Sequence, residues 1–186
     1  MKRAFDIFLV TFILVAVTPF MLLICVLVKV TSHGPVIYSS NRLGQDNRIF
    51  RMPKFRTMKV NTPELATHII NNPDQFLTRP GKFLRKSSLD ELPQLFSILK
   101  GDMSLVGPRP ALHNQEDLIE LRNQSGVCNI KQGLTGLAQI NGRDELSIPS
   151  KVELDIEYLE NRSFLLDVKI LFLTFLKVFF KKDITH

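Results

Sequence analysis

The longest apolar stretch of the chain lies near its start, where residues Ile7 to Val28 include no charged side chain. A helix of about 20 apolar residues is long enough to cross the roughly 30 Å hydrocarbon core of a bilayer. Thr18 and Pro19 lie in the middle of this run. Proline in a helix interior removes a backbone hydrogen bond and costs about 3 kcal/mol, so a kink or break is expected there. The pattern predicts an apolar membrane segment over residues 1–33.

Basic residues flank this segment on both sides, with Lys2 and Arg3 before it and Lys29 after it. Basic flanks favour the cytoplasmic side of a membrane. A re-entrant helix-break-helix, which enters and leaves by the cytoplasmic face, satisfies both flanks. A single-pass anchor is the alternative that hydrophobicity alone supports. A cleaved signal peptide fits poorly, because the run is too long and no small-x-small cleavage site follows it.

The middle of the chain shows the alternating strand and helix patterns of one mixed α+β domain over residues 34–163. Residues 36–39 and 49–52 have the composition of two short strands, and residues 44–47 have that of the turn between them. Helix start and stop residues predict further helices. These helices cover about residues 62–71, 89–99, 113–124 and 150–161.

The last segment, residues 164–186, is apolar and aromatic, but Asp167, Lys169 and Lys177 interrupt it. Its longest uncharged run, Ile170 to Leu176, is too short to span a bilayer. A basic amphipathic helix that lies in the membrane interface fits this pattern. A terminal helix of the protein core is the alternative.

Composition narrows the classes of partner. The formal net charge of +6 and the hydrophobic fraction of 45% indicate a packed domain with an anionic partner, which is nucleic acid, an anionic bilayer or a phosphorylated substrate. Nucleic acid is disfavoured, because no known binding module is present and the aromatic residues fall mostly in the apolar ends. Cys25 and Cys128 are isolated, and the four histidines have no ligand spacing, so neither a disulfide nor a His/Cys metal site is indicated.

The first stretch whose side chains could carry out a reaction contains two adjacent carboxylates, Asp90 and Glu91, shortly after Arg85. Such a pair can hold a divalent cation or supply a nucleophile, and neighbouring cations keep a carboxylate ionised. Ser88 followed three residues later by Glu91 also matches a capping box at a helix start. From these residues alone, helix capping and catalysis are equally supported, and both can hold together.

A second stretch places Arg109 between Pro108 and Pro110, just after Gly107. Two fixed proline backbones leave the guanidinium little conformational freedom to lose, which suits bidentate capture of phosphate. An ordinary turn with a solvated arginine is the alternative at this position.

Three weaker signals accompany these stretches. Lys54 and Arg56 alternate, so in a strand both side chains point to one face. The glycines of residues 132–136 are expected to expose backbone amides, and Arg143 adds one more cation after Asn141-Gly142. Each signal alone is better explained by a solvated basic face or a plain turn. Together they place several cations on restricted loops, as a pyrophosphate ligand requires.

In this combination and order, the motifs resemble those of the monotopic phosphoglycosyl transferases, also called the bacterial sugar transferase family, in its minimal form. The resemblance extends over essentially the whole chain. It rests on Lys2–Asp6, Pro19, Gly34–Pro35, Lys54–Met58, Leu89–Leu95, Leu99–Ser104, Val106–Pro110, Thr135–Gly136 and Asn141–Arg143.

The resemblance implies a location and a reaction. It implies a re-entrant helix broken at Thr18-Pro19, with the catalytic domain on the cytoplasmic face of the bacterial inner membrane. Many relatives have serine before this proline, and threonine can likewise bond back to a helix carbonyl. The implied reaction moves a sugar 1-phosphate from a UDP-sugar to undecaprenyl phosphate and releases UMP. It is the first membrane step of glycoconjugate assembly, and an N-acetylated or modified hexose is the favoured sugar.

The resemblance also assigns roles to residues. Asp90 attacks the β-phosphate, and the resulting phosphosugar-aspartate ester is then attacked by the lipid phosphate. The implied cofactor is Mg²⁺, held by Asp90 with Glu91 close by, and Glu91 is a metal ligand, a base or a helix cap. The phosphate-binding candidates are Arg85, Arg109, Lys54, Arg56 and Arg143.

Two alternatives remain from the sequence. The first is the same transfer by direct attack of the lipid phosphate, with Asp90 or Glu91 as a base and no covalent intermediate. The second is a non-catalytic basic membrane adaptor. The expected partners are the UDP-sugar, the polyprenyl phosphate, membrane lipid and downstream glycosyltransferases.

Overall fold

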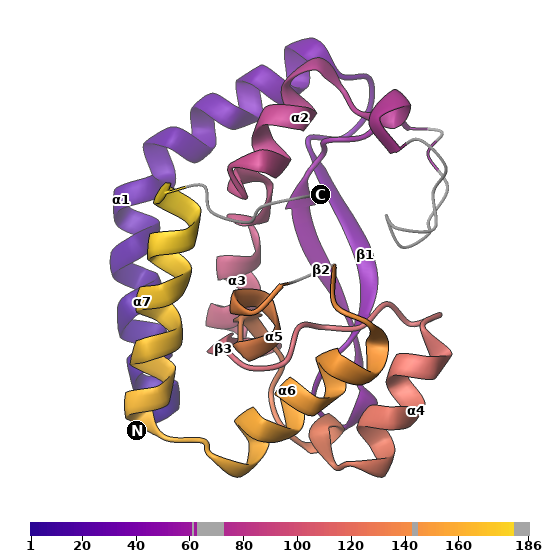
Figure 1. Cartoon of the computed structure of the whole chain (residues 1–186). Helices are drawn as coiled ribbons and strands as arrows, with labels where there is room; N and C mark the ends of the chain where they lie inside the picture. Colours follow the sequence, from indigo (N-terminus) through magenta and orange to yellow (C-terminus); the bar gives the residue numbers. More distant parts are fainter. Residues whose placement is uncertain (61, 63–72, 143–144, 181–186) are drawn as a thin grey trace.

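Seven α-helices and two small sheets make up the part of the chain that the computed structural model describes, which is residues 1–186 without 61, 63–72, 143–144 and 181–186 (Figure 1). The mixed α+β class predicted from the sequence is confirmed. The helices are α1 (Lys2–Thr31), α2 (Arg79–Lys86), α3 (Gln94–Lys100), α4 (Glu116–Gln124), α5 (Leu137–Ile140), α6 (Ile148–Glu160) and α7 (Phe164–Phe180). The strands are β1 (Ile37–Leu43), β2 (Ile49–Phe55), β3 (Ser104–Val106) and β4 (Gly133–Thr135).

The first sheet is an antiparallel hairpin of β1 and β2, in register from Ile37 opposite Phe55 to Leu43 opposite Ile49. Asp46 and Asn47 in the connecting turn have φ values of 54° and 57°. This left-handed region is unusual for most residues, but Asp and Asn enter it more readily. The predicted strand pair and turn are therefore confirmed, with both strands longer than the sequence indicated.

The second sheet is a short parallel pair, with Ser104 opposite Gly133 and Val106 opposite Thr135. The backbones lie so close that a Cβ added at Gly133 would be 2.1 Å from the Gly107 nitrogen. The expectation of exposed amides over residues 132–136 is wrong, because Gly133, Thr135 and Gly136 are buried in this contact. The glycines instead bring β4 against the end of β3.

The helix predicted over residues 89–99 begins differently from expectation. Residues Leu89–Glu91 form a 3-10 turn, and the α-helix α3 starts only at Gln94. Pro93 explains the delay, because it lacks the N–H that would bond to the Leu89 carbonyl in an α-helix. The predicted helices over 113–124 and 150–161 correspond to α4 and α6, whereas the one over 62–71 falls almost wholly outside the described residues.

Helix α1 continues through Thr18 and Pro19, and Figure 1 shows it bent along its course. The predicted kink is present, but the predicted break into two helices is not. The Thr18 hydroxyl donates to the Leu14 carbonyl at 2.6 Å, as expected for threonine before proline. By length and composition α1 is able to cross a membrane.

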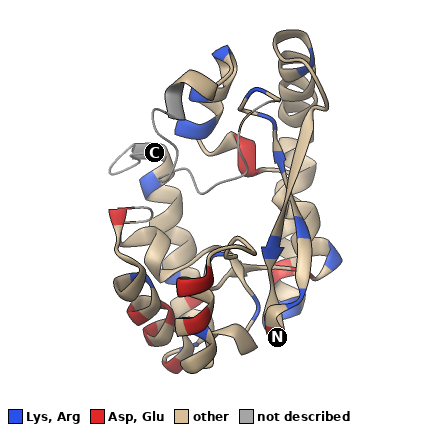
Figure 2. Cartoon of the chain, turned by 90° about the vertical axis from the view of Figure 1, so that its right-hand side faces the viewer, with Lys and Arg blue, Asp and Glu red and all other residues tan. Residues whose placement is uncertain are grey.

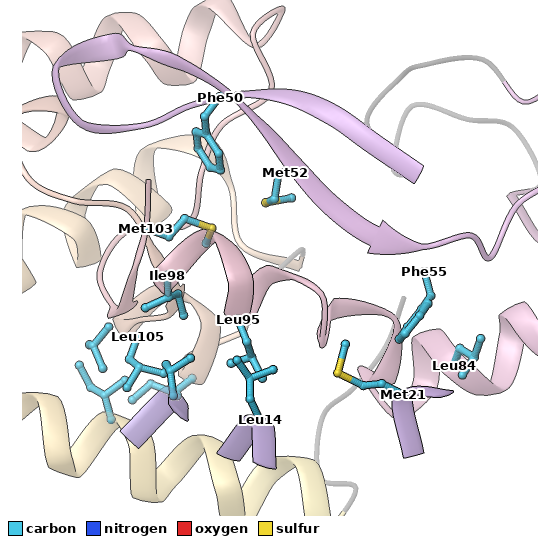
Figure 3. Close-up of a cluster of buried hydrophobic side chains, with 14 of the residues drawn as sticks. Leu14, Met21, Phe50, Met52, Phe55, Leu84, Leu95, Ile98, Met103 and Leu105 are labelled. Carbon is cyan, nitrogen blue, oxygen red and sulfur yellow. The ribbon is translucent and has the colours of Figure 1, made fainter. Parts of the chain in front are cut away.

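One face of α1 packs against the rest of the protein along the whole helix. Its buried apolar residues are Val10, Leu14, Met21, Ile24 and Val28. Figure 3 shows Leu14 and Met21 directed toward the core side chains of β2, α2 and α3. The other faces of α1 leave large apolar side chains exposed. These include Phe8, Phe12, Val15, Phe20, Leu22, Leu23, Val26 and Val30.

The amino end of α1 is fixed to the body by polar contacts. The Lys2 ammonium donates to the Val106 carbonyl at 3.0 Å and to the Tyr158 hydroxyl at 2.9 Å, and it pairs with Asp167. The Arg3 guanidinium donates to the Ile98 and Leu99 carbonyls at the end of α3. The start of the apolar helix is thus held close to β3 and α3.

Helix α7 lies beside α1 (Figure 1), where the Phe5 and Phe164 rings meet edge to face at 5.0 Å. Ile170 is fully buried on one side of α7, whereas Leu165 and Phe172 are exposed. The helix therefore packs into the core on one side and leaves apolar side chains exposed on another.

Candidate active site

Two of the residues predicted to bind phosphate, Lys54 and Arg109, come together at Glu91, although they are far apart in the sequence. The Lys54 ammonium at the end of β2 donates to Glu91 Oε1 at 2.8 Å. The Arg109 guanidinium, in the loop after β3, donates to both carboxylate oxygens of Glu91, one of them at 3.3 Å. A bidentate pair of this kind fixes the geometry of both groups.

The contacts of Glu91 also decide the capping alternative. The Ser88 amide donates to the Arg85 carbonyl at 3.0 Å rather than to Glu91. Ser88 has a φ of 57° and its side chain makes no capping hydrogen bond. The prediction of a capping box is therefore wrong, because the Glu91 carboxylate accepts hydrogen bonds from Lys54 and Arg109 instead.

Asp90 lies next to this cluster and is 5% exposed. No hydrogen bond to its carboxylate is found among the residues that the structure describes. Burial raises the pKa of Asp90, and the charge of Glu91 adds to this, while Lys54, Arg85 and Arg109 act in the opposite direction. A carboxylate with cations near it but no hydrogen bond on it is a more reactive nucleophile than a solvated one.

The pKa values of Glu91 and Lys54, which lie beside Asp90, are both lowered. Burial works against ionisation of Glu91, yet Arg109 and Lys54 hold the pKa of this carboxyl well below its usual range. Burial lowers the pKa of Lys54, which Glu91 partly offsets. A carboxylate whose pKa is so low is a poor general base, so the geometry favours Glu91 as an anchor for the two cations.

Arg85 reaches the site from the last turn of α2. Its Nε donates to Thr57 Oγ1 at 3.2 Å, and its Nη2 lies 3.6 Å from Met58 Sδ. The stretch from Lys54 to Met58 therefore has two roles in the site. Lys54 pairs with Glu91, and Thr57 and Met58 contact the Arg85 guanidinium. Sequence reasoning missed the role of Thr57, whose partner lies 28 positions later and leaves no local pattern.

Two other predicted residues are not part of the cluster as described. Arg56 Nε donates to the Pro35 carbonyl at 2.8 Å, and its guanidinium lies over the Tyr38 ring at 5.7 Å. Tyr38 is the cross-strand partner of Lys54, so Arg56 and Lys54 share a face as predicted. Arg143 lies outside the described residues.

Buried polar groups without partners accompany the carboxylates. The Ser88 hydroxyl and both amide atoms of Gln94 are buried and form no hydrogen bond within the described part of the chain. Groups of this kind are rare in folded proteins and are usually satisfied by a water or a ligand. They lie two residues before and four residues after Asp90.

Charge is unevenly distributed over the molecule. Figure 2 shows acidic residues concentrated at the end where α4 and α6 lie. The Asp90–Glu91 pair is instead surrounded by Lys54, Arg85 and Arg109. The site thus has the positive surroundings that a nucleoside diphosphate requires.

The carboxylates of the site determine whether it can hold the implied Mg²⁺. Among the described residues, no group of three or more His, Cys, Asp or Glu side chains converges. Mg²⁺ is commonly held by one or two carboxylates together with substrate phosphates. Asp90, with Glu91 adjacent, fits that arrangement if the substrate diphosphate completes the coordination.

Known proteins resemble the chain along nearly its full length. The family model described as bacterial sugar transferase matches residues 1–181. The uncharacterized sugar transferase EpsL of Bacillus subtilis (strain 168) is 42% identical over 185 residues, which cover 99% of this chain and 90% of EpsL.

Longer proteins also match. The UDP-glucose:undecaprenyl-phosphate glucose-1-phosphate transferase of Escherichia coli (strain K12) is 43% identical over 195 residues, covering 98% of this chain and 41% of that protein. A UDP-N-acetylgalactosamine-undecaprenyl-phosphate N-acetylgalactosaminephosphotransferase of Aeromonas hydrophila is 38% identical over 178 residues, covering 93% of this chain and 42% of that protein. This chain spans about two fifths of the length of these two relatives. With a family match over residues 1–181 and a relative of nearly equal length, the chain belongs to the bacterial sugar transferase family.

Proposed function

We propose that this protein is a phosphoglycosyl transferase that moves a sugar 1-phosphate from a UDP-sugar to undecaprenyl phosphate and releases UMP. The observation that carries the proposal is the Asp90 carboxylate, which has no hydrogen bond among the described residues and lies beside Lys54, Arg85 and Arg109. The names of two relatives describe transfer of glucose 1-phosphate or N-acetylgalactosamine phosphate to undecaprenyl phosphate, which supports the proposal.

In the first half of the proposed reaction, an Asp90 carboxylate oxygen attacks the β-phosphorus of the UDP-sugar. The new oxygen–phosphorus bond forms as the bond from that phosphorus to the bridging oxygen breaks, and UMP leaves with the electron pair. The product is a sugar phosphate joined to Asp90 as an acyl phosphate. Burial of Asp90 supports this role, because desolvation makes its charged form more reactive.

The cations of the site bind the negative charge of the diphosphate. Arg109 and Lys54 are both anchored on Glu91, so they meet the phosphate oxygens from fixed positions. Arg85 adds a third cation from α2. Mg²⁺, held by Asp90 and the phosphates with Glu91 close by, would supply further neutralisation of that charge.

In the second half, a phosphate oxygen of undecaprenyl phosphate attacks the same phosphorus. The bond to Asp90 breaks, its carboxylate is restored, and the polyprenyl-diphosphate-sugar leaves. Downstream glycosyltransferases would extend this product into a glycoconjugate. Direct attack by the lipid phosphate on the UDP-sugar would give the same products without the intermediate.

A lipid acceptor requires the site to lie at the membrane surface, and the packing of α1 supports such a position. The start of α1 is tied to β3 and α3, and Met21, Ile24 and Val28 in its second half pack on the same core. If α1 ran straight through a bilayer, this attached body and its charges would enter the hydrocarbon, at high cost. We therefore propose that both ends of α1 lie on the cytoplasmic face of the inner membrane, with its exposed apolar side chains and those of α7 in the lipid.

Cysteine labelling tests this topology. In a chain with Cys25 and Cys128 replaced by serine, Ala4→Cys and Asn41→Cys place single thiols at exposed positions on either side of the apolar run. In intact cells, neither thiol is expected to react with a membrane-impermeant maleimide, and both are expected to react after permeabilisation. Labelling of position 4 alone in intact cells would show a single-pass helix. A periplasmic protein with an exposed cysteine serves as the positive control.

A donor screen tests the proposed activity. Purified full-length protein with Mg²⁺ and undecaprenyl phosphate is offered UDP-glucose, UDP-N-acetylgalactosamine and modified UDP-hexoses, and UMP release is measured. We expect release with one donor or a small group of related donors. If no donor releases UMP, and Asp90→Asn leaves the cellular phenotype intact, the protein is a membrane adaptor instead.

A further inference from the structure

The loop that carries Arg109 is anchored through three successive carbonyl groups. The Pro108 carbonyl accepts from the Gly133 amide at 2.8 Å, and the Pro110 carbonyl accepts from Arg42 Nη1 at 3.1 Å. Between them, the Arg109 carbonyl accepts from Arg122 Nη1 at 2.8 Å. The two prolines have no N–H to donate, so the carbonyl groups are the main polar anchors that this loop has.

Arg122 is itself held in place from the opposite side. Its Nε and Nη2 donate to Asp155 Oδ2 at 3.0 and 2.6 Å. Both side chains are buried, with 8% of Arg122 and 2% of Asp155 exposed. When two nitrogens of a planar guanidinium donate to one carboxylate, the position of the third nitrogen is fixed as well. In Arg122 this third nitrogen is Nη1, which donates to the Arg109 carbonyl.

We infer that Arg122, oriented by Asp155, is a positioning residue for the phosphate-binding arginine, Arg109. The contact runs from α6 through α4 to the Arg109 backbone, and from the Arg109 side chain to Glu91 beside the reactive carboxylate. Arg122 does not touch the acidic pair, so it acts only through Arg109. This inference rests on the proposed function, because the effect on Arg109 is read through phosphate transfer.

The central test replaces the buried ion pair with an apolar pair. Arg122→Met combined with Asp155→Leu leaves no unpaired charge, and buried ion pairs exchanged for packed apolar residues generally keep the fold. The variant loses the donor to the Arg109 carbonyl. We expect kcat/KM for UMP release to fall about 10-fold or more, because small displacements of a substrate-positioning group are costly. We expect the thermal unfolding midpoint to stay near that of the parent.

A double-mutant cycle separates positioning from general structural damage. If Arg122 acts through Arg109, then Arg122→Lys lowers kcat/KM in the parent protein but has no further effect in Arg109→Ala. Lysine keeps the charge opposite Asp155, but its single ammonium cannot reproduce the fixed fork. Gln124→Met, an exposed change on the same helix, is the matched control and is expected to keep parental activity.

Each outcome separates this inference from the proposed function. If the parent protein releases no UMP from any donor, the proposed function fails first. The positioning role is overturned if the parent is active and Arg122→Lys leaves kcat/KM unchanged. It is also overturned if Arg122→Lys lowers kcat/KM by the same factor in the parent and in Arg109→Ala. Should the apolar pair prevent folding, as judged by circular dichroism, the cycle with Arg122→Lys carries the test alone.

Discussion

Asp90→Asn is expected to lower UMP release at least about 10³-fold, because the amide cannot form the oxygen–phosphorus bond. The fold should tolerate the change. Asparagine has the same shape, and the Asp90 carboxylate has no hydrogen bond to lose among the described residues. Burial already disfavours the charged form of Asp90, so a neutral side chain should leave the unfolding midpoint unchanged or higher. Steady-state release of UMP and thermal unfolding measure the two effects.

Asp102→Asn provides the matched control for this substitution. Asp102 follows α3 and pairs with Lys100 at 3.2 Å, and 76% of the Lys100 side chain is exposed. Neither residue makes a described contact with Lys54, Glu91 or Arg109. An exposed pair of this kind contributes little to stability. Activity close to that of the parent is expected. A loss as large in Asp102→Asn as in Asp90→Asn would mean that the assay reports general damage.

Gly133→Ala is expected to destabilise the protein by about 3 kcal/mol or more. A Cβ at this position would lie 2.1 Å from the Gly107 nitrogen, 2.5 Å from the Thr135 oxygen and 2.6 Å from the Gly107 oxygen. All three are backbone atoms, so β3 and β4 must separate to make room. The Gly133 amide also holds the Pro108 carbonyl next to Arg109, so phosphate transfer should fall with stability. Denaturant unfolding of the full-length protein measures the change.

Gly44→Ala is the control for the added methyl group. Gly44 has a φ of −98°, and its added Cβ would meet the movable Phe50 ring at 3.3 Å. A loss of less than about 1 kcal/mol is expected. Equal destabilisation of the two variants would show that the close approach of β3 and β4 is not what requires glycine at position 133.

Features that depend on nearby residues followed from the sequence. Two short runs with strand composition, on either side of a turn that contains Asp46 and Asn47, predicted the β1–β2 hairpin, because strand pairing across a short turn depends on nearby residues. Fixed backbone angles at Pro108 and Pro110 indicated a held arginine between them. The structure places Arg109 on Glu91 as a bidentate pair.

The sequence misled where local and distant partners compete. Ser88 and Glu91 have the spacing of a capping box, but Lys54 and Arg109 offer Glu91 two cations from distant segments. Charge-assisted hydrogen bonds in a buried site are stronger than a cap at a helix start. A local motif therefore indicated the position of Glu91 but not its partners.

Other parts of the site left no signal in the chain. Arg122 and Asp155 are 33 positions apart, and each looks like an ordinary charge on an amphipathic helix. Their burial follows from how α4 and α6 pack, which no local pattern shows. Similarly, the glycines at 133 and 136 look like turn residues, but they are needed because two backbones come into contact.

Covalent trapping tests the central claim most directly. The purified protein is mixed with Mg²⁺ and the active UDP-sugar labelled in its β-phosphate, with undecaprenyl phosphate withheld, and the protein is digested for mass spectrometry. We expect UMP release in an amount matching the protein, label on the peptide that contains Asp90, and loss of the label when undecaprenyl phosphate is added. An unlabelled protein that releases UMP only when the lipid is present would contradict the account and show direct attack by the lipid phosphate.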